Sequence, residues 1–350
     1  MGMRLPGGIC HEEELYNFLI EQKDARSIVP PNRYNVDAHF SPHCKKGTVI
    51  TRQGYFLDAD LANFDPTTFK TTATEASHLD PNQRLSLEVV REALESAGEI
   101  NWRGKKIGTY VGLFGEDWQD MRQKDACFNS SYGLIGALDY AIANRISYEY
   151  DLKGPRWAIF RLLPGSACVL TTCSVMVKTA CSSAAVGLHE AMQEIQRGNI
   201  TSAIVAGANL IFAPGMTVAM SIQAALSPEG SSKSFDAAAD GYARGEAVTA
   251  IYIKRLDEAI RDGNPVRAIL RASSSNSDGR TLGFSTPNAD SHEAAMREAY
   301  SIAGLDFSQT AMVEAHGTGT ATGDPIEAEA IARCFGKEGV YIGAVRIFQF

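Results

Sequence analysis

Apolar residues recur along this chain at two spacings that alternate with each other. Runs rich in β-branched residues predict strands at 106–114, 175–180, 203–207, 247–254, 266–272 and 312–315. Apolar positions at helical spacing predict helices at 12–22, 81–97, 139–148, 184–197, 291–303 and 324–335. Apart from its one helix, the segment 1–65 reads as loops. Strands that alternate with helices in this way predict an α/β layered fold.

The helix at 81–97 has the clearest end signals. Asp80 is the expected N-cap, Pro81 takes the first helical position, and Gly98 ends the helix. The strand at 175–180, the helix at 184–197 and the strand at 203–207 follow one another directly, so we interpret 175–212 as a βαβ unit.

Composition and charge exclude several classes of protein. A chain of 350 residues, 45% of them apolar, can bury a large core in one domain or in two fused halves. A net charge of −8 without a basic cluster argues against nucleic acid or an anionic membrane as the main partner. We see no apolar run of membrane-spanning length and no signal peptide, and therefore expect no membrane association.

The cysteines indicate a compartment and argue against a metal site. There are seven, an odd number, and they are scattered along the chain, which fits a reducing, cytoplasmic location. Cys168 and Cys173 have no paired His or Cys cluster at ligand spacing, so no metal is expected.

Cys181 is the first candidate for chemistry. The predicted strand leads into Lys-Thr-Ala-Cys-Ser-Ser, and a helix follows, which places the thiol at a strand-to-helix turn. Backbone N–H groups and the positive end of a helix dipole favour a thiolate there, and a thiolate is an activated nucleophile. On the heptapeptide 177–183 alone, an ordinary buried cysteine is an equal alternative.

His316 is the second candidate. It follows a predicted strand and enters the loop Gly-Thr-Gly-Thr-Ala-Thr-Gly, which leads into a helix. Strand ends are where α/β folds bind ligands, and glycine lets backbone approach a substrate closely. The alternative is a core histidine beside a flexible turn. Asp324 is the expected N-cap of the helix that follows, and Arg244 and Glu246 are expected to form a structural ion pair.

Together these segments resemble the β-ketoacyl synthase (ketosynthase) domain of the thiolase superfamily, most nearly that of fungal, reducing type I polyketide synthases. The resemblance covers nearly the whole chain. It rests on motifs that occur in the family's order at 5–8, 29–35, 54–57, 79–85, 112–118, 143–148, 178–183, 234–236, 241–246, 276–279 and 314–325.

The resemblance implies a fold, an activity and partners. The fold is a thiolase-like, layered αβαβα arrangement of two similar halves, residues 1–255 and an incomplete 256–350. The activity is decarboxylative Claisen condensation in polyketide or fatty acid biosynthesis. Cys181 would carry the acyl chain as a thioester and its N–H would donate to the oxyanion. His316 would help to decarboxylate a malonyl-type extender.

The substrates that the resemblance implies are acyl and malonyl thioesters, carried on the phosphopantetheine of an acyl carrier protein. Thr318, Thr320 and Asn276 are the positions that it places near the phosphopantetheine arm. The domain itself would need no cofactor. The family also implies a homodimer formed through the region around the cysteine-bearing unit.

Three departures from the family pattern lead to other expectations. The segment 343–346 does not continue into Asn-x-Gly-His, the motif with the second catalytic His, and the apolar strand expected before Gly2 is missing. Residues 156–173 interrupt the motif order; we interpret them as a retained intron or gene-model error, with a genuine surface loop as the alternative.

The departures predict a chain truncated at both ends, and an alternative function as an inactive ketosynthase-like fragment. A degradative, thiolase-like enzyme is a third possibility. The Gly-Thr-Gly-Thr run after His316 and the Asp-Pro-x-Gln-Arg start of the 81–97 helix favour a ketosynthase.

Overall fold

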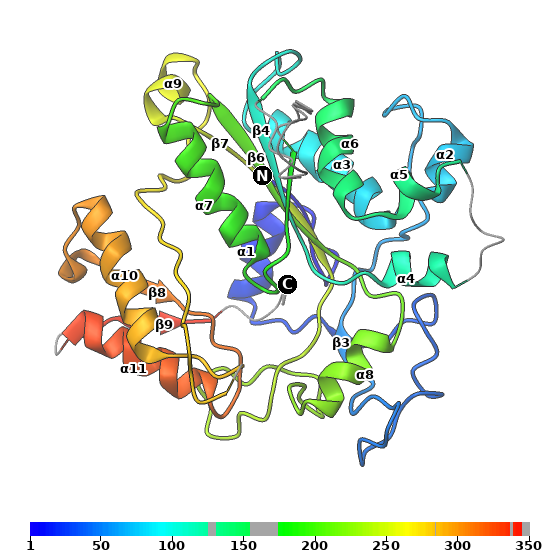
Figure 1. Ribbon diagram of the computed structural model, residues 1–350, viewed down its shortest axis with the longest axis vertical. Coiled ribbons are helices and arrows are strands. Elements are labelled where there is room, and N and C mark those ends of the chain that lie inside the picture. The colour runs from blue at the N-terminus through cyan, green and yellow to red at the C-terminus, as the bar shows by residue number, and fades with distance from the viewer. Residues whose placement is uncertain (125–130, 155–173, 284, 337–338, 345–350) are drawn as a thin grey trace, which may run out of the picture.

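The computed structural model describes residues 1–124, 131–154, 174–283, 285–336 and 339–344. Its largest sheet has the strand order β1-β7-β6-β4-β5 (Figure 1). The strands are β1 (Gly2–Arg4), β7 (Ala247–Lys254), β6 (Ser202–Asn209), β4 (Ile107–Leu113) and β5 (Ser174–Val177). β5, β4 and β6 are parallel, whereas β7 is antiparallel to β6 and β1 to β7. The loops that follow β4, β5 and β6 therefore leave the same end of the sheet.

Helices cover both faces of this sheet. α3 (Pro81–Ser96) and α6 (Tyr140–Glu149) pack on one face, and α7 (Ser183–Gln196) packs on the other. Neighbouring residues of β4 face the two opposite sides of the sheet. Val111 belongs to the core beneath α3 and α6, and Tyr110 belongs to the core beneath α7. Asp80, Pro81 and Gly98 occupy the predicted cap positions of α3. These layers confirm the predicted α/β class.

Smaller elements surround the sheet. They are α1 (Glu12–Ile20), β2 (Arg26–Ile28), β3 (Gln53–Tyr55), α2 (Ala73–His78), α4 (Asp117–Gln123), α5 (Gly133–Ala137), α8 (Gly215–Ile222) and α9 (Leu256–Arg261). β2 pairs with β3, and β1 pairs with β7, so the prediction of loops and one helix over 1–65 missed these short strands.

The C-terminal part of the described chain forms a second group of elements beside α7 (Figure 1). β8 (Met312–Glu314) is parallel to β9 (Tyr341–Gly343). α10 (Ala289–Ala303) packs on α11 (Gly323–Phe335), and a 3₁₀ turn lies at Phe307–Gln309. Ile331, Cys334 and Phe335 form the core of this group.

Two predictions about this fold are wrong. No strand is present at 266–272, because a strand requires neighbouring N–H and C=O groups, and none of the described strands pairs with that segment. Glu246 does not pair with Arg244. Its two oxygens accept from Arg33 at 2.7 and 2.9 Å and from the backbone N–H of Leu57 and of Ile211 at 2.9 Å. These bonds saturate the carboxylate, and Arg244 donates instead to Thr217.

The described segments contain no helix that is both long and apolar enough to cross a membrane. In the same part of the chain, no group of three His, Cys, Asp or Glu side chains is arranged to hold a metal ion. The proposed insertion at 156–173 lies outside the described residues.

A close contact fixes α7 against the sheet. A Cβ on Gly112 of β4 would lie 2.4 Å from the backbone N of Ala184, in the first turn of α7. Real Cβ atoms do not approach backbone so closely, so glycine is required for this contact. Gly187, one turn further along α7, has space for a Cβ, which would lie 3.5 Å from the Cβ of Tyr110.

We expect opposite effects from the same substitution at these two glycines. Gly112→Ala should lower the free energy of unfolding by about 2 kcal/mol, because backbone must move to accept the methyl group. Gly187→Ala should raise it by about 1 kcal/mol, because alanine favours the helix and fills ordinary contact distance. Urea denaturation measures both. A Gly112→Ala variant as stable as the parent protein would contradict the close contact.

Candidate active site

Cys181 lies in the predicted place, the turn from β5 into α7. β5 ends at Val177 and α7 begins at Ser183. Ala180 has a φ of 55°, the left-handed region that a residue with a Cβ rarely adopts. The Ser183 hydroxyl donates to the carbonyl oxygen of Ala180 at 2.6 Å and accepts from the Thr179 N–H at 2.9 Å. Local hydroxyl bonds thus hold a strained turn immediately before the thiol.

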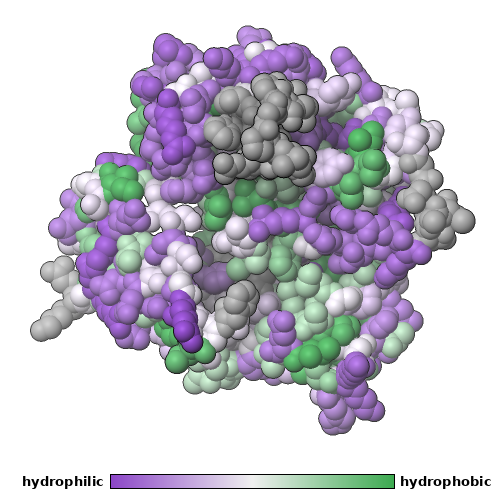
Figure 2. Space-filling model, viewed as in Figure 1, coloured by the Kyte–Doolittle hydropathy of each residue, from purple (hydrophilic) through white to green (hydrophobic). Residues whose placement is uncertain are grey.

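The structure brings Cys181 and His316 together across 135 residues of sequence. The distance from Cys181 Sγ to His316 Nε2 is 3.7 Å, and both residues are exposed. In Figure 1 the first turn of α7 lies near the centre of the face in view. Figure 2 shows that this centre is pale to green, hence more apolar, and that much of the rim around it is purple and hydrophilic. A thiol beside an imidazole in such a setting can act as a nucleophile with a proton donor at hand.

Carboxylates of α11 hold the loop that carries His316. The two oxygens of Glu327 accept from the backbone N–H of His316 at 2.6 Å and of Gly317 at 2.7 Å. The N-cap position of α11 is Thr322, so the prediction of Asp324 as N-cap is wrong. Asp324 lies inside the first turn, where its carboxylate accepts from the N–H of Gly319 at 3.0 Å and of Phe235 at 2.7 Å. A carboxylate near a helix N-terminus is favoured by the dipole, and here it also binds the preceding loop.

The remaining predicted site residues are Thr318, Thr320 and Asn276, and each forms a hydrogen bond with another residue. The hydroxyls of Thr318 and Thr320 are 3.0 Å apart, and Thr320 also accepts from the N–H of Gly323. Both therefore lie in the loop that follows His316. Asn276 is exposed and donates to the carbonyl oxygen of Ser291 in α10. The structure thus groups Thr318 and Thr320 with His316, and it binds Asn276 to α10.

Three residues that sequence reasoning did not assign to the site also border it. Glu327 is one of them. Tyr242 is the second. Its neighbour Gly241 donates its N–H to the carbonyl oxygen of Gly319, in the loop that follows His316. Burial, together with negative charge on Cys181, raises the pKa of Tyr242. Lys178, in the same motif as Cys181, is the third, and it binds Glu116 and Asp139. Glu327 could have been found from the sequence, because it follows Asp324 by three residues, nearly one helical turn, and so lies on the same side of the helix. The contact of Tyr242 depends on tertiary packing alone.

Comparison with protein-family models gives two matches that together cover most of the chain. The model for the N-terminal domain of β-ketoacyl synthase matches residues 1–160 and 166–259. The model for the C-terminal domain of β-ketoacyl synthase matches residues 267–347.

Curated relatives are similar over 99% of this chain. A highly reducing polyketide synthase from a Fusarium species is 57% identical over 348 residues. Another from Aspergillus fumigatus is 52% identical over 349 residues. In each case the chain spans only 13% of the length of the relative.

Solved structures with a similar fold are ketosynthase domains. The oxazolomycin ketosynthase domain of Streptomyces albus superposes with a TM-score of 0.87 at 29% identity, over 98% of this chain and 58% of that one. The ketosynthase from module 6 of the bacillaene synthase of Bacillus subtilis superposes with a TM-score of 0.83 at 31% identity, over 98% of this chain and 56% of that one. These likenesses confirm the thiolase-like fold that the sequence predicted, and the chain belongs to the β-ketoacyl synthase family.

Proposed function

We propose that this chain is the condensing domain of a polyketide synthase. In this role Cys181 accepts an acyl chain and His316 assists the decarboxylative Claisen condensation of that chain with a malonyl-type extender. The observation that carries the proposal is the 3.7 Å distance between Cys181 Sγ and His316 Nε2, in a member of the β-ketoacyl synthase family.

The first step is acyl transfer. The Cys181 thiol loses its proton to water, and the thiolate attacks the carbonyl carbon of an incoming thioester. The bond from that carbon to the carrier sulfur breaks, and the carrier thiolate takes up a proton from water. The start of α7 favours the thiolate through the helix dipole. The backbone N–H of Cys181 is the group that we assign to the developing oxyanion, because such donors act where charge forms.

The second step forms the carbon–carbon bond. The malonyl group loses carbon dioxide, and the electrons of the broken bond form an enolate. Nε2–H of His316 donates a hydrogen bond to the enolate oxygen, and the enolate carbon attacks the acyl carbonyl on Cys181. A β-ketoacyl thioester results and the Cys181 thiolate is released. His316 can donate to the enolate while the enolate carbon approaches the acyl group on Cys181, because its imidazole lies beside the sulfur.

The substrates that we propose are acyl and malonyl thioesters on the phosphopantetheine of an acyl carrier protein. We propose that Thr318 and Thr320 lie beside the phosphopantetheine arm, because they belong to the loop that follows His316. Asn276 is also proposed, from the family resemblance alone. A cytoplasmic location is supported by the free thiols of Cys10, Cys44, Cys181 and Cys334.

A homodimer and a division into halves at residue 255 complete the proposal. β5 is the edge strand of the described five-stranded sheet, and an edge strand can pair with a second copy. Leu134 and Ile135 on α5 and Tyr148 on α6 add exposed apolar surface, and α6 packs against β5. The gap between the two family-model matches, 260–266, supports the division of the chain.

Condensation is the activity that tests the proposal. The full chain, given an acyl thioester and a malonyl thioester of pantetheine, should release carbon dioxide and form a β-ketoacyl thioester, detected by mass spectrometry. Cys181→Ala should abolish the product. His316→Ala should lower the rate by about 100-fold or more, the usual contribution of a proton donor in place. Cys10→Ser, at another exposed thiol, should retain full activity. Absence of product from the parent chain would favour the inactive-fragment alternative.

Glu327 offers a test of how His316 is held. In Glu327→Gln, the amide NH₂ group would face a backbone N–H that now donates to a carboxylate oxygen, so one donor loses its acceptor. We expect condensation to slow by roughly 10-fold, because small displacements of a reacting group are costly. Glu329→Gln is the matched control, since Glu329 lies on the same helix and pairs with Arg333. Equal rates for the two variants would contradict a positioning role for Glu327.

A further inference from the structure

Lys178 connects the turn that carries Cys181 to two other helices. It lies three residues before Cys181, directly after the end of β5. Its ammonium group forms ion pairs with Glu116 and with Asp139. Glu116 occupies the N-cap position of α4, and Asp139 occupies that of α6, where it accepts from the N–H of Tyr140. A single side chain therefore ties the turn to the starts of α4 and α6.

The ion pairs keep Lys178 charged although it is partly buried. Burial acts against the ammonium, but the hydrogen bonds that it donates to Asp139 and Glu116 outweigh burial and raise the pKa of Lys178. The three side chains together carry a net charge of −1. Without the lysine charge they would carry −2 close to the turn, which would disfavour a thiolate at Cys181.

The hydroxyl hydrogen bonds of the turn connect residues within 179–183. The Ser182 hydroxyl donates to the carbonyl oxygen of Thr179, and the Ser183 hydroxyl donates to that of Ala180. These bonds join the turn to itself and to the first residues of α7. The left-handed backbone of Ala180 is strained, so contacts with other elements are needed to hold the turn in this conformation.

We propose that Lys178 is a positioning residue for Cys181, which fixes the nucleophile relative to His316 by binding Glu116 and Asp139. The inference rests on the proposed role of Cys181 as the acyl carrier. Half-exposed ion pairs add little to stability, so the role of Lys178 lies in the geometry and charge of the turn rather than in folding.

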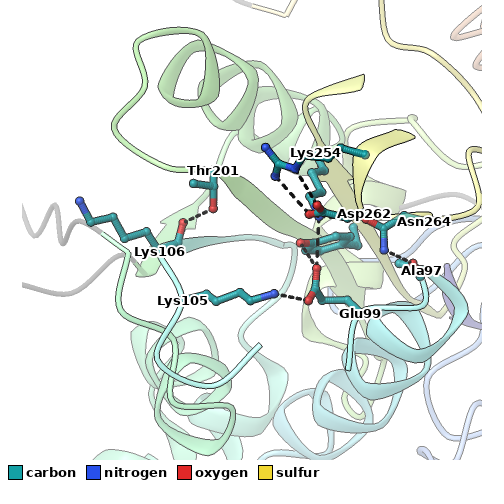
Figure 3. A network of polar contacts seen from close by, with 10 residues as sticks. Ala97, Glu99, Lys105, Lys106, Thr201, Lys254, Asp262 and Asn264 are labelled. Carbon is teal, nitrogen blue, oxygen red and sulfur yellow. Dashed lines mark hydrogen bonds and ion pairs between the residues drawn. The ribbon is translucent and has the colours of Figure 1, made fainter. Parts of the chain in front are cut away.

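The chain contains a matched lysine far from the site. Lys254, at the end of β7, binds Asp262 at 2.6 Å and Asn264 at 2.9 Å and lies 3.5 Å from Glu99, as Figure 3 shows. Lys254 pairs in register with Ser202 at the start of β6, hence at the end of the sheet opposite to Cys181. It too is an ammonium between two carboxylates, so Lys254→Met controls for the loss of such a pair.

The test measures alkylation of Cys181 by iodoacetamide in the full chain, quantified by peptide mass spectrometry from pH 5 to pH 9. Cys10 serves as the reference thiol in the same tube. The titratable groups that face Cys181 are His316 and Tyr242, and all variants retain them. Lys178→Met should slow Cys181 alkylation at pH 7 by about 10-fold and shift its pH–rate profile to higher pH. Lys178→Arg should restore the rate to within about 3-fold, since a guanidinium can bind both carboxylates.

Alkylation of Cys10 should be the same in every variant, and Lys254→Met should leave Cys181 at the parent rate. A Lys178→Met variant with the parent rate and profile overturns the inference, as does a Lys178→Arg variant as slow as Lys178→Met. If Lys178→Met does not fold, Lys178→Gln replaces it with the same expectation. A different result would contradict the proposed function: Cys181 of the parent chain is alkylated at a normal rate but accepts no acyl group.

Discussion

The close contact of α7 with β4 at Gly112 is the constraint on which the site depends. Parallel pairing places the end of β5 beside Gly112, and the first turn of α7 lies directly against the same glycine. The chain between them has only a few residues in which to reverse direction, which requires the left-handed backbone of Ala180. Cys181 must therefore lie at the carboxyl end of the parallel strands, immediately before a helix.

A second set of contacts holds the histidine that lies beside Cys181. His316 comes from the other group of elements, and its loop is fixed by backbone N–H groups that donate to Glu327 and Asp324. Each part of the site is thus built locally, by hydroxyls at the start of α7 and by carboxylates on α11. The tertiary fold brings the two parts together, so that Cys181 Sγ lies 3.7 Å from His316 Nε2.

The sequence predicted the features that short-range chemistry determines. Asp80, Pro81 and Gly98 define the ends of α3 through capping, and the strand–cysteine–helix order places Cys181 correctly. Features that depend on distant residues could not be predicted in this way. Arg33 reaches Glu246 across 213 residues, so the expected pair with Arg244 was wrong. An apolar run at 266–272 has the composition of a strand, but a pattern along one segment does not show which strand would pair with it. Likewise, the contact of Glu327 with the His316 loop depends on how α11 is oriented.

The most direct test of the central claim is to find where an acyl group attaches. The full chain would be incubated with a short-chain acyl thioester of pantetheine and digested without reduction, and its peptides would be read by mass spectrometry. We predict one acyl group, on the peptide that contains Cys181. An acyl group distributed over Cys10 and Cys44 as readily as over Cys181 would contradict it, because the turn before α7 would then confer no special reactivity.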